Sequence, residues 1–72
     1  MTTATATKKL STTARRAIKA YGIDACHKAF EMNDREGYGA SSIANSGPKT
    51  IRTTRQADAA INAGRELAGL TA

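Results

Sequence analysis

Large apolar side chains are scarce in this chain, and this scarcity limits the core that it can build. Among 72 residues only nine are Leu, Ile, Val or Phe, namely Leu10, Ile18, Ile23, Phe30, Ile43, Ile51, Ile61, Leu67 and Leu70. Because apolar burial stabilises a fold by roughly 25 cal/mol per Å², a core made mostly of alanine is weakly stabilised. We therefore expect one small domain, over residues 10–72, which a second copy in a homodimer or another partner completes.

Charge is distributed unevenly along the sequence. Eleven Lys and Arg residues against six Asp and Glu residues give a net charge of +5. Residues 1–19 carry five cations and no acid, residues 20–36 carry four acids and two cations, and residues 37–55 carry three cations and no acid. Two basic stretches therefore flank an acidic one, which favours an acidic partner, either a nucleic acid or an acidic host protein.

The chain holds one cysteine and one histidine, the neighbours Cys26 and His27. Neighbouring residues on a helix point about 100° apart, so these two are poorly placed to act as nucleophile and base. A single thiol forms no internal disulfide, and one Cys with one His is a poor set of metal ligands. We expect Cys26 in the core, His27 on the surface, and no enzyme activity, cofactor or metal site.

No apolar run in the sequence is long enough for a signal peptide or a membrane-spanning helix. Together with the lone cysteine, this predicts a cytoplasmic protein with no membrane contact. Residues 1–9 have no periodic apolar residues and end on two lysines, so we expect a disordered basic arm there.

Two short helices are expected after this arm. Ser11 or Thr12 suits the N-cap of the first helix, and Gly22 suits its C-terminal end. The second helix is expected from about Asp24 to Asn33, because an acid favours a helix N-terminus. The alternative is one longer helix kinked at Gly22, since apolar residues keep a spacing of four across this glycine.

A β-hairpin is expected in the middle of the chain. Residues 40–44 and 49–53 flank a turn sequence at residues 45–48, and the second flank is rich in β-branched residues. Ile43 and Ile51 would then face inward.

A helix-turn-helix is a weaker alternative for the same region. It would use Ser41 to Ala44 as the first helix, Gly47 at the turn, and a second helix from Pro48 or Lys49. Thr and Ile are poor interior helix formers, which disfavours this arrangement.

The clearest helix signal lies in the last third of the chain. Thr53 and Gln56 match the spacing of a capping box, and small and apolar residues then recur along one face. We expect a helix from about Thr54 to Ala68, capped by Gly69. The predicted fold class is α+β, with two short N-terminal helices, a small β-hairpin and a C-terminal helix, and an all-α fold is the alternative.

Six cations outside the N-terminal arm support the main functional hypothesis. Three lie on the first expected helix and three on or beside the hairpin, so the fold could join them into one phosphate-contacting surface. The alternative interpretation is a solvated face that only keeps the protein soluble. Tyr38 is left for a partner, because Tyr21 lies on the apolar stripe of its helix. The candidate nucleic-acid-binding residues are Arg15, Arg16, Lys19, Lys49, Arg52 and Arg55.

Two segments resemble parts of small proteins carried on plasmids, prophages and other mobile elements. They are residues 20–26, with the sequence AYGIDAC, and residues 53–64, with the sequence TTRQADAAINAG. The resemblance implies a genomic context in which small DNA-binding regulators and inhibitors of host defence are both common.

Two functions are compatible with these observations. The first is a non-catalytic basic accessory protein of a mobile element that binds nucleic acid through a basic surface. The alternative is a protein-binding inhibitor of host defence, of the anti-CRISPR or anti-restriction type. In that case the same surface would bind an acidic host protein, or the hairpin would add a strand to a partner's sheet.

Overall fold

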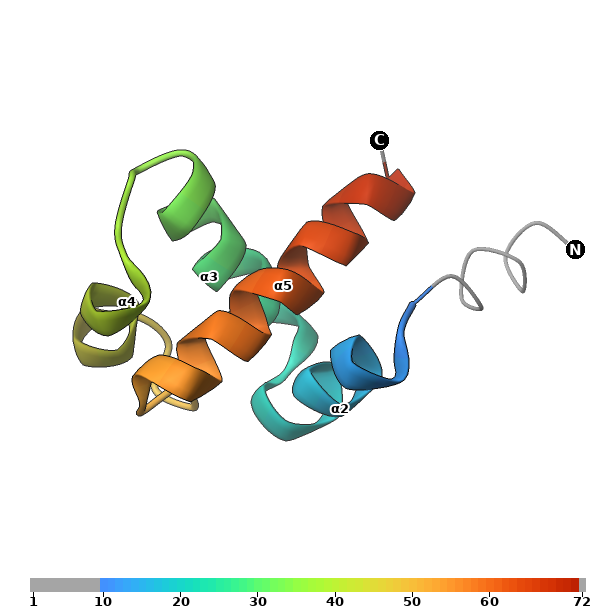
Figure 1. Cartoon of the computed structure of the whole chain (residues 1–72), viewed down its shortest axis with the longest axis horizontal. Helices are drawn as coiled ribbons and strands as arrows, with labels where there is room; N and C mark the ends of the chain where they lie inside the picture. The colour runs from blue at the N-terminus through green and yellow to red at the C-terminus, as the bar shows by residue number, and fades with distance from the viewer. Residues whose placement is uncertain (1–9, 72) are drawn as a thin grey trace, which may run out of the picture.

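The structure, a computed structural model, describes the backbone of residues 10–71 and the side chains of residues 10–69. No strand occurs among these residues, so the predicted α+β class is wrong and the fold of this part is all-helical. The expected basic arm, residues 1–9, lies outside the described residues. The helices, labelled in Figure 1, are α2 (Thr12–Tyr21), α3 (Ile23–Asp34), α4 (Ala40–Ser46) and α5 (Thr54–Thr71).

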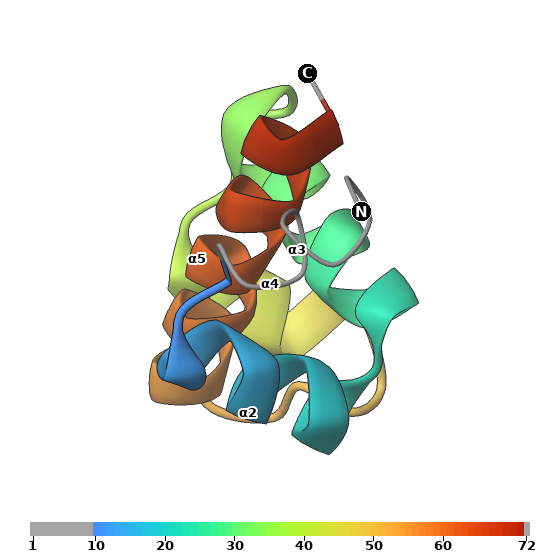
Figure 2. The ribbon, with the colours of Figure 1, turned by 90° about the vertical axis from the view of Figure 1, so that its right-hand side faces the viewer.

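Helix α5 is the element against which the other helices pack. It contacts α2, α3 and α4, and in Figure 1 it runs diagonally through the molecule and crosses in front of α3. Figure 2 shows the same helices turned by 90°, with α2 at the bottom of the view. Its apolar and small residues recur at intervals of three and four, which gives it one continuous face for this packing. The buried residues of that face are Ala57, Ala60, Ile61, Ala63, Gly64 and Leu67.

The boundary between α2 and α3 forms as the sequence predicts. Ser11 is the N-cap of α2, and its hydroxyl accepts the Ala14 N–H at 3.0 Å. Gly22 ends the helix with a φ of 97°, a left-handed conformation that side chains other than glycine rarely adopt. Two separate helices therefore form, and the alternative of one helix kinked at Gly22 is wrong.

Residues 40–53 form α4 and an irregular connection in place of the expected hairpin. Ile43 and Ile51 are both buried, as predicted, but they reach the core without strand pairing. Local hydrogen bonds hold the second half of the connection. The Ile51 N–H donates to the Pro48 carbonyl at 3.1 Å, and the Arg52 N–H donates to Gln56 Oε1 at 2.8 Å.

The hairpin prediction is wrong because only one of its flanks suits a strand. Residues 49–53 include three β-branched residues, whereas residues 40–44 include only Ile43. An isolated two-stranded hairpin is marginally stable in water, while two turns of helix bury Ile43 with its own backbone satisfied. The helix-turn-helix alternative also places the second helix too early, since α5 begins at Thr54 and not at Pro48 or Lys49.

The start of α5 confirms the predicted capping box. The Gln56 N–H donates to Thr53 Oγ1 at 3.1 Å, and the Thr53 N–H donates to Gln56 Oε1 at 3.3 Å. The far end differs from the prediction, because the helix continues through Gly69 to Thr71.

Small residues allow α3 and α5 to approach closely. A Cβ atom added to Gly64 would overlap the carbonyl oxygen of Cys26 and come within 2.5 Å of Phe30 Cβ. Ala29 on α3 and Ala60 on α5 are also fully buried. Close packing of the helix backbones therefore compensates for the small number of large apolar side chains. It retains dispersion contacts that would be lost if the helices were further apart.

Candidate functional site

Three hydrogen bonds hold the two ends of α2. At the start of α2, the Ser11 N–H and Oγ–H donate to the Glu66 carboxylate at 2.8 and 2.7 Å. At its end, the Tyr21 carbonyl accepts the Thr50 hydroxyl at 2.8 Å. The C-terminal end of α2 therefore lies beside the connection that leads into α5.

This arrangement brings the C-terminal end of α2 next to the connection that carries Lys49. Lys19 lies two residues before Tyr21, and Lys49 is next to Thr50, so both are near the hydrogen bond that joins α2 to the connection. We call the six predicted cations together the basic surface. All six are exposed, and they are Arg15, Arg16, Lys19, Lys49, Arg52 and Arg55.

The six cations are not equally close to this end. Arg15 precedes Lys19 by four residues and shares its side of α2, but it lies one turn further from the connection. Arg52 is tied to the first turn of α5 by its backbone bond to Gln56, and Arg55 lies within that turn. Lys19 and Lys49 therefore lie beside the Thr50–Tyr21 hydrogen bond, Arg52 and Arg55 follow in the connection and the first turn of α5, and Arg15 and Arg16 lie further along α2.

Acidic residues are largely separated from the basic surface. Residues 12–21 and 47–57 contain no Asp or Glu, while four of the six acids lie on α3 or in the turn after it. Arg55 is a cation near a helix N-terminus, where the helix dipole is itself positive and no acid occupies the first turn. The charges at this end therefore reinforce one another.

Asp58 and Glu66 are the two acids on α5. Asp58 is exposed and follows Arg55 by three residues. Glu66 is engaged at the other end of α2, where the hydrogen bonds from Ser11 lower the pKa of its carboxyl.

The one cysteine and the one histidine lie in different environments. Cys26 is fully buried and His27 is exposed, as the sequence predicts, and burial raises the pKa of the Cys26 thiol. No group of three His, Cys, Asp or Glu residues within the described part of the chain could hold a metal ion. Over the same part, no helix has the length and apolar character needed to cross a membrane.

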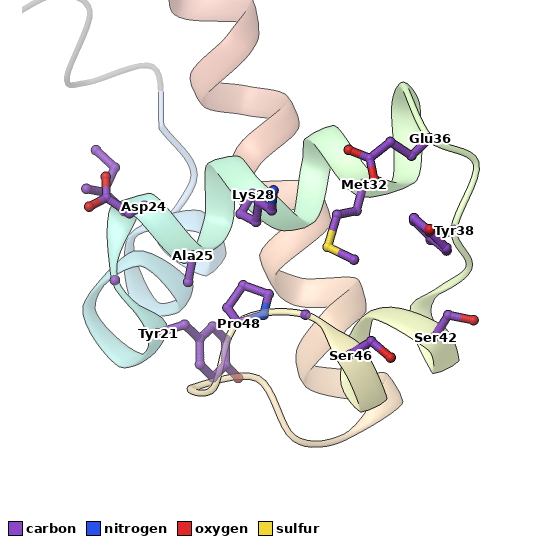
Figure 3. A pocket seen from close by; sticks show the side chains of 13 residues that line it. Tyr21, Asp24, Ala25, Lys28, Met32, Glu36, Tyr38, Ser42, Ser46 and Pro48 are labelled. Carbon is purple, nitrogen blue, oxygen red and sulfur yellow. The ribbon is translucent and has the colours of Figure 1, made fainter.

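A second feature, which the sequence did not reveal, is a groove of about 1130 Å³ between α3 and α4. Figure 3 shows Lys28, Met32 and Glu36 along its α3 side and Ser42 and Ser46 on α4. Ile23 and Tyr38 also line the groove, and 48% and 46% of their surfaces are exposed. The exposure of Tyr38 agrees with its expected availability to a partner.

Comparison of the chain with protein-family models found no match, and neither the curated proteins nor the solved structures gave one.

Proposed function

We propose that this chain is a non-catalytic nucleic-acid-binding protein that holds phosphates through the basic surface. One observation carries the proposal. The Thr50–Tyr21 hydrogen bond joins two acid-free stretches of sequence, so Lys19 and Lys49, about thirty residues apart in the sequence, both lie within two residues of that contact.

The chemistry of these side chains suits phosphates. Arginine presents a planar fork of donors that matches two phosphate oxygens, and lysine supplies a compact positive charge. Arg15 and Lys19 lie about 6 Å apart along the α2 axis, so both can reach one stretch of sugar–phosphate backbone. Contacts of this kind neutralise phosphates without reading bases, and we propose that binding depends weakly on sequence.

The second candidate is a protein-binding inhibitor of host defence, in which the basic surface binds an acidic host protein. The exposed position of all six cations is compatible with it. The version in which a hairpin extends a partner's sheet is wrong, because residues 40–53 contain no strand. The accessory role in a mobile element remains part of the proposal and rests on the resemblance of residues 20–26 and 53–64.

The test is a titration of a fluorescently labelled random-sequence DNA duplex, and of a labelled single strand, with the full chain. We expect binding to both, with an affinity that falls steeply as salt rises, because released counterions drive phosphate binding. A polyglutamate competitor separates the two functions. Absence of duplex and single-strand binding at low salt, together with tight polyglutamate binding, would favour the acidic-protein partner.

A further inference from the structure

One end of the groove between α3 and α4 lies beside the basic surface. Tyr21 and Pro48 line this end, as Figure 3 shows. Lys49 follows Pro48 directly in the sequence, and the Thr50 hydroxyl donates to the Tyr21 carbonyl at 2.8 Å. A phosphate that contacts Lys49 is therefore close to the end of the groove.

The groove offers apolar and aromatic surface beyond that end. Met32 lines its middle and is only 7% exposed, so it belongs to the core and forms the floor of the groove. Tyr38 lies at the opposite end from Tyr21 in Figure 3, and 46% of its surface is exposed. Nucleobases stack on tyrosine rings with little regard to sequence, because every base has a π-face.

Tyr38 is presented by a fixed backbone. Its N–H donates to the Met32 carbonyl at 2.9 Å, and its own carbonyl accepts the Asn33 side-chain amide at 2.9 Å. Gly37, with a φ of 77°, allows the chain to turn back between α3 and Tyr38. A ring held in place before binding loses little conformational freedom when a base stacks on it.

The charges of the groove favour bases over phosphates inside it. Asp24, Lys28 and Glu36 line it, so it holds two acids against one cation, whereas the basic surface beside it holds cations. A single strand can turn its bases inward and its phosphates toward solvent. A duplex cannot, since its bases are already paired and stacked.

We propose that the groove takes unpaired bases of a single-stranded nucleic acid whose neighbouring phosphates are held by the basic surface. The proposal rests on the proposed function and adds the form of nucleic acid that the chain prefers. Groove-lining residues of α3 run from Ile23 to Met32, about 14 Å along the helix axis. Stacked nucleotides of one strand are about 3.4 Å apart, so the groove has the length for about three bases.

The test compares three labelled ligands by fluorescence anisotropy with the full chain. They are a thymidine homopolymer of about 12 nucleotides, a strand of the same length in which every nucleotide is abasic, and the random-sequence duplex. We expect the thymidine strand to bind about tenfold or more tightly than the abasic strand, because only the former has bases to stack. Stacking releases no counterions, so this ratio should stay constant while both affinities fall with salt.

Two variants of one exposed residue assign the effect to the groove. Tyr38→Ser removes the ring without changing any charge, and we expect it to weaken thymidine-strand binding by about fivefold or more. Its affinities for the abasic strand and the duplex should be unchanged. Tyr38→Phe keeps the ring and should restore tight binding of the thymidine strand. Circular dichroism checks that each variant is folded.

The outcomes separate this proposal from the proposed function. Equal affinities for the thymidine and abasic strands would overturn the groove as a base site while leaving phosphate binding in place. The same holds if Tyr38→Ser binds all three ligands normally, or weakens all three alike. If no ligand binds at low salt, the proposed function fails, and the base site fails with it.

Discussion

Gly64 is the residue on which the close approach of α3 and α5 depends. An added methyl group would meet backbone atoms of Cys26 that cannot move without shifting a helix. Alanine normally stabilises a helix relative to glycine by about 1 kcal/mol, but overpacking costs about 1–3 kcal/mol. We therefore expect Gly64→Ala to lower the free energy of unfolding, measured by urea denaturation.

Gly69 provides the matched control, because it lies in the same helix with nothing within 4 Å of an added Cβ. Gly69→Ala should leave stability unchanged or raise it by up to about 1 kcal/mol. If Gly64→Ala proved equally neutral or stabilising, the two helices would have to be further apart than the structure shows.

The reactivity of Cys26 tests the same interface between α3 and α5. Its side chain is fully buried, and desolvation raises the pKa of the thiol, so both access and thiolate formation are unfavourable in the folded chain. We expect an aromatic disulfide reagent to modify Cys26 at least about a hundredfold more slowly in buffer than in concentrated urea, because reaction requires opening of the fold. Equal absorbance-monitored rates in the two solvents would show that the α3–α5 interface is open.

Local sequence signals predicted the ends of the helices well, but they predicted the conformation of residues 40–53 poorly. Ser11, Gly22 and the Thr53–Gln56 box each fix a helix end through contacts within four residues, so the sequence reveals them. The conformation of residues 40–53 depends instead on how Ile43 and Ile51 reach α5, which is a tertiary contact that β-propensity does not report. The inward direction of both isoleucines was predictable from their apolarity, but the backbone that delivers them was not.

The contact between the start of α2 and α5 makes stability depend on pH. Glu66 accepts two hydrogen bonds from Ser11, and these lower its pKa from the ordinary value of 4.5. Because the pKa of Glu66 is lower in the folded chain than in the unfolded chain, its carboxylate contributes fully to the free energy of unfolding above about pH 4.5. This contribution is lost as the pH falls through the folded-state pKa. We expect Glu66→Gln to destabilise the chain by about 1 kcal/mol at neutral pH, since the contact is near the surface.

The measurement is the difference in unfolding free energy between the unchanged protein and Glu66→Gln at a series of pH values. The difference should shrink steadily below pH 4.5. Asp58→Asn, at an exposed acid of the same helix, controls for the general effect of losing a negative charge. A difference that stays constant down to strongly acidic pH would mean that the carboxylate does not hold α2.

For the whole molecule, the sequence identified the members of the candidate site but not its arrangement. The six cations are recognisable from charge patterning alone, whereas the approach of Lys19 and Lys49 follows from the Thr50–Tyr21 contact. The groove was not predictable from the sequence. Glu36 lies after the end of α3, so it lines the groove together with Lys28 and Met32 only because of the conformation of the turn that follows this helix. The separation of charges can therefore be predicted from the sequence, whereas the shape of the surface depends on how the helices pack.

The central claim is that nucleic acid contacts this one end of the molecule, and the salt dependence of affinity tests it most directly. Arg52→Ala with Arg55→Ala removes two cations of the basic surface, while Arg35→Ala with Arg65→Ala removes two exposed cations that lie outside it.

The two double variants have the same net charge, so any difference between them reports position. The decisive quantity is the slope of the logarithm of the duplex association constant against the logarithm of salt concentration. We expect the first variant to lower the magnitude of that slope by roughly two, about one for each lost phosphate contact, and the second to leave it unchanged. Equal slopes for both variants, with intact folds, would contradict the account.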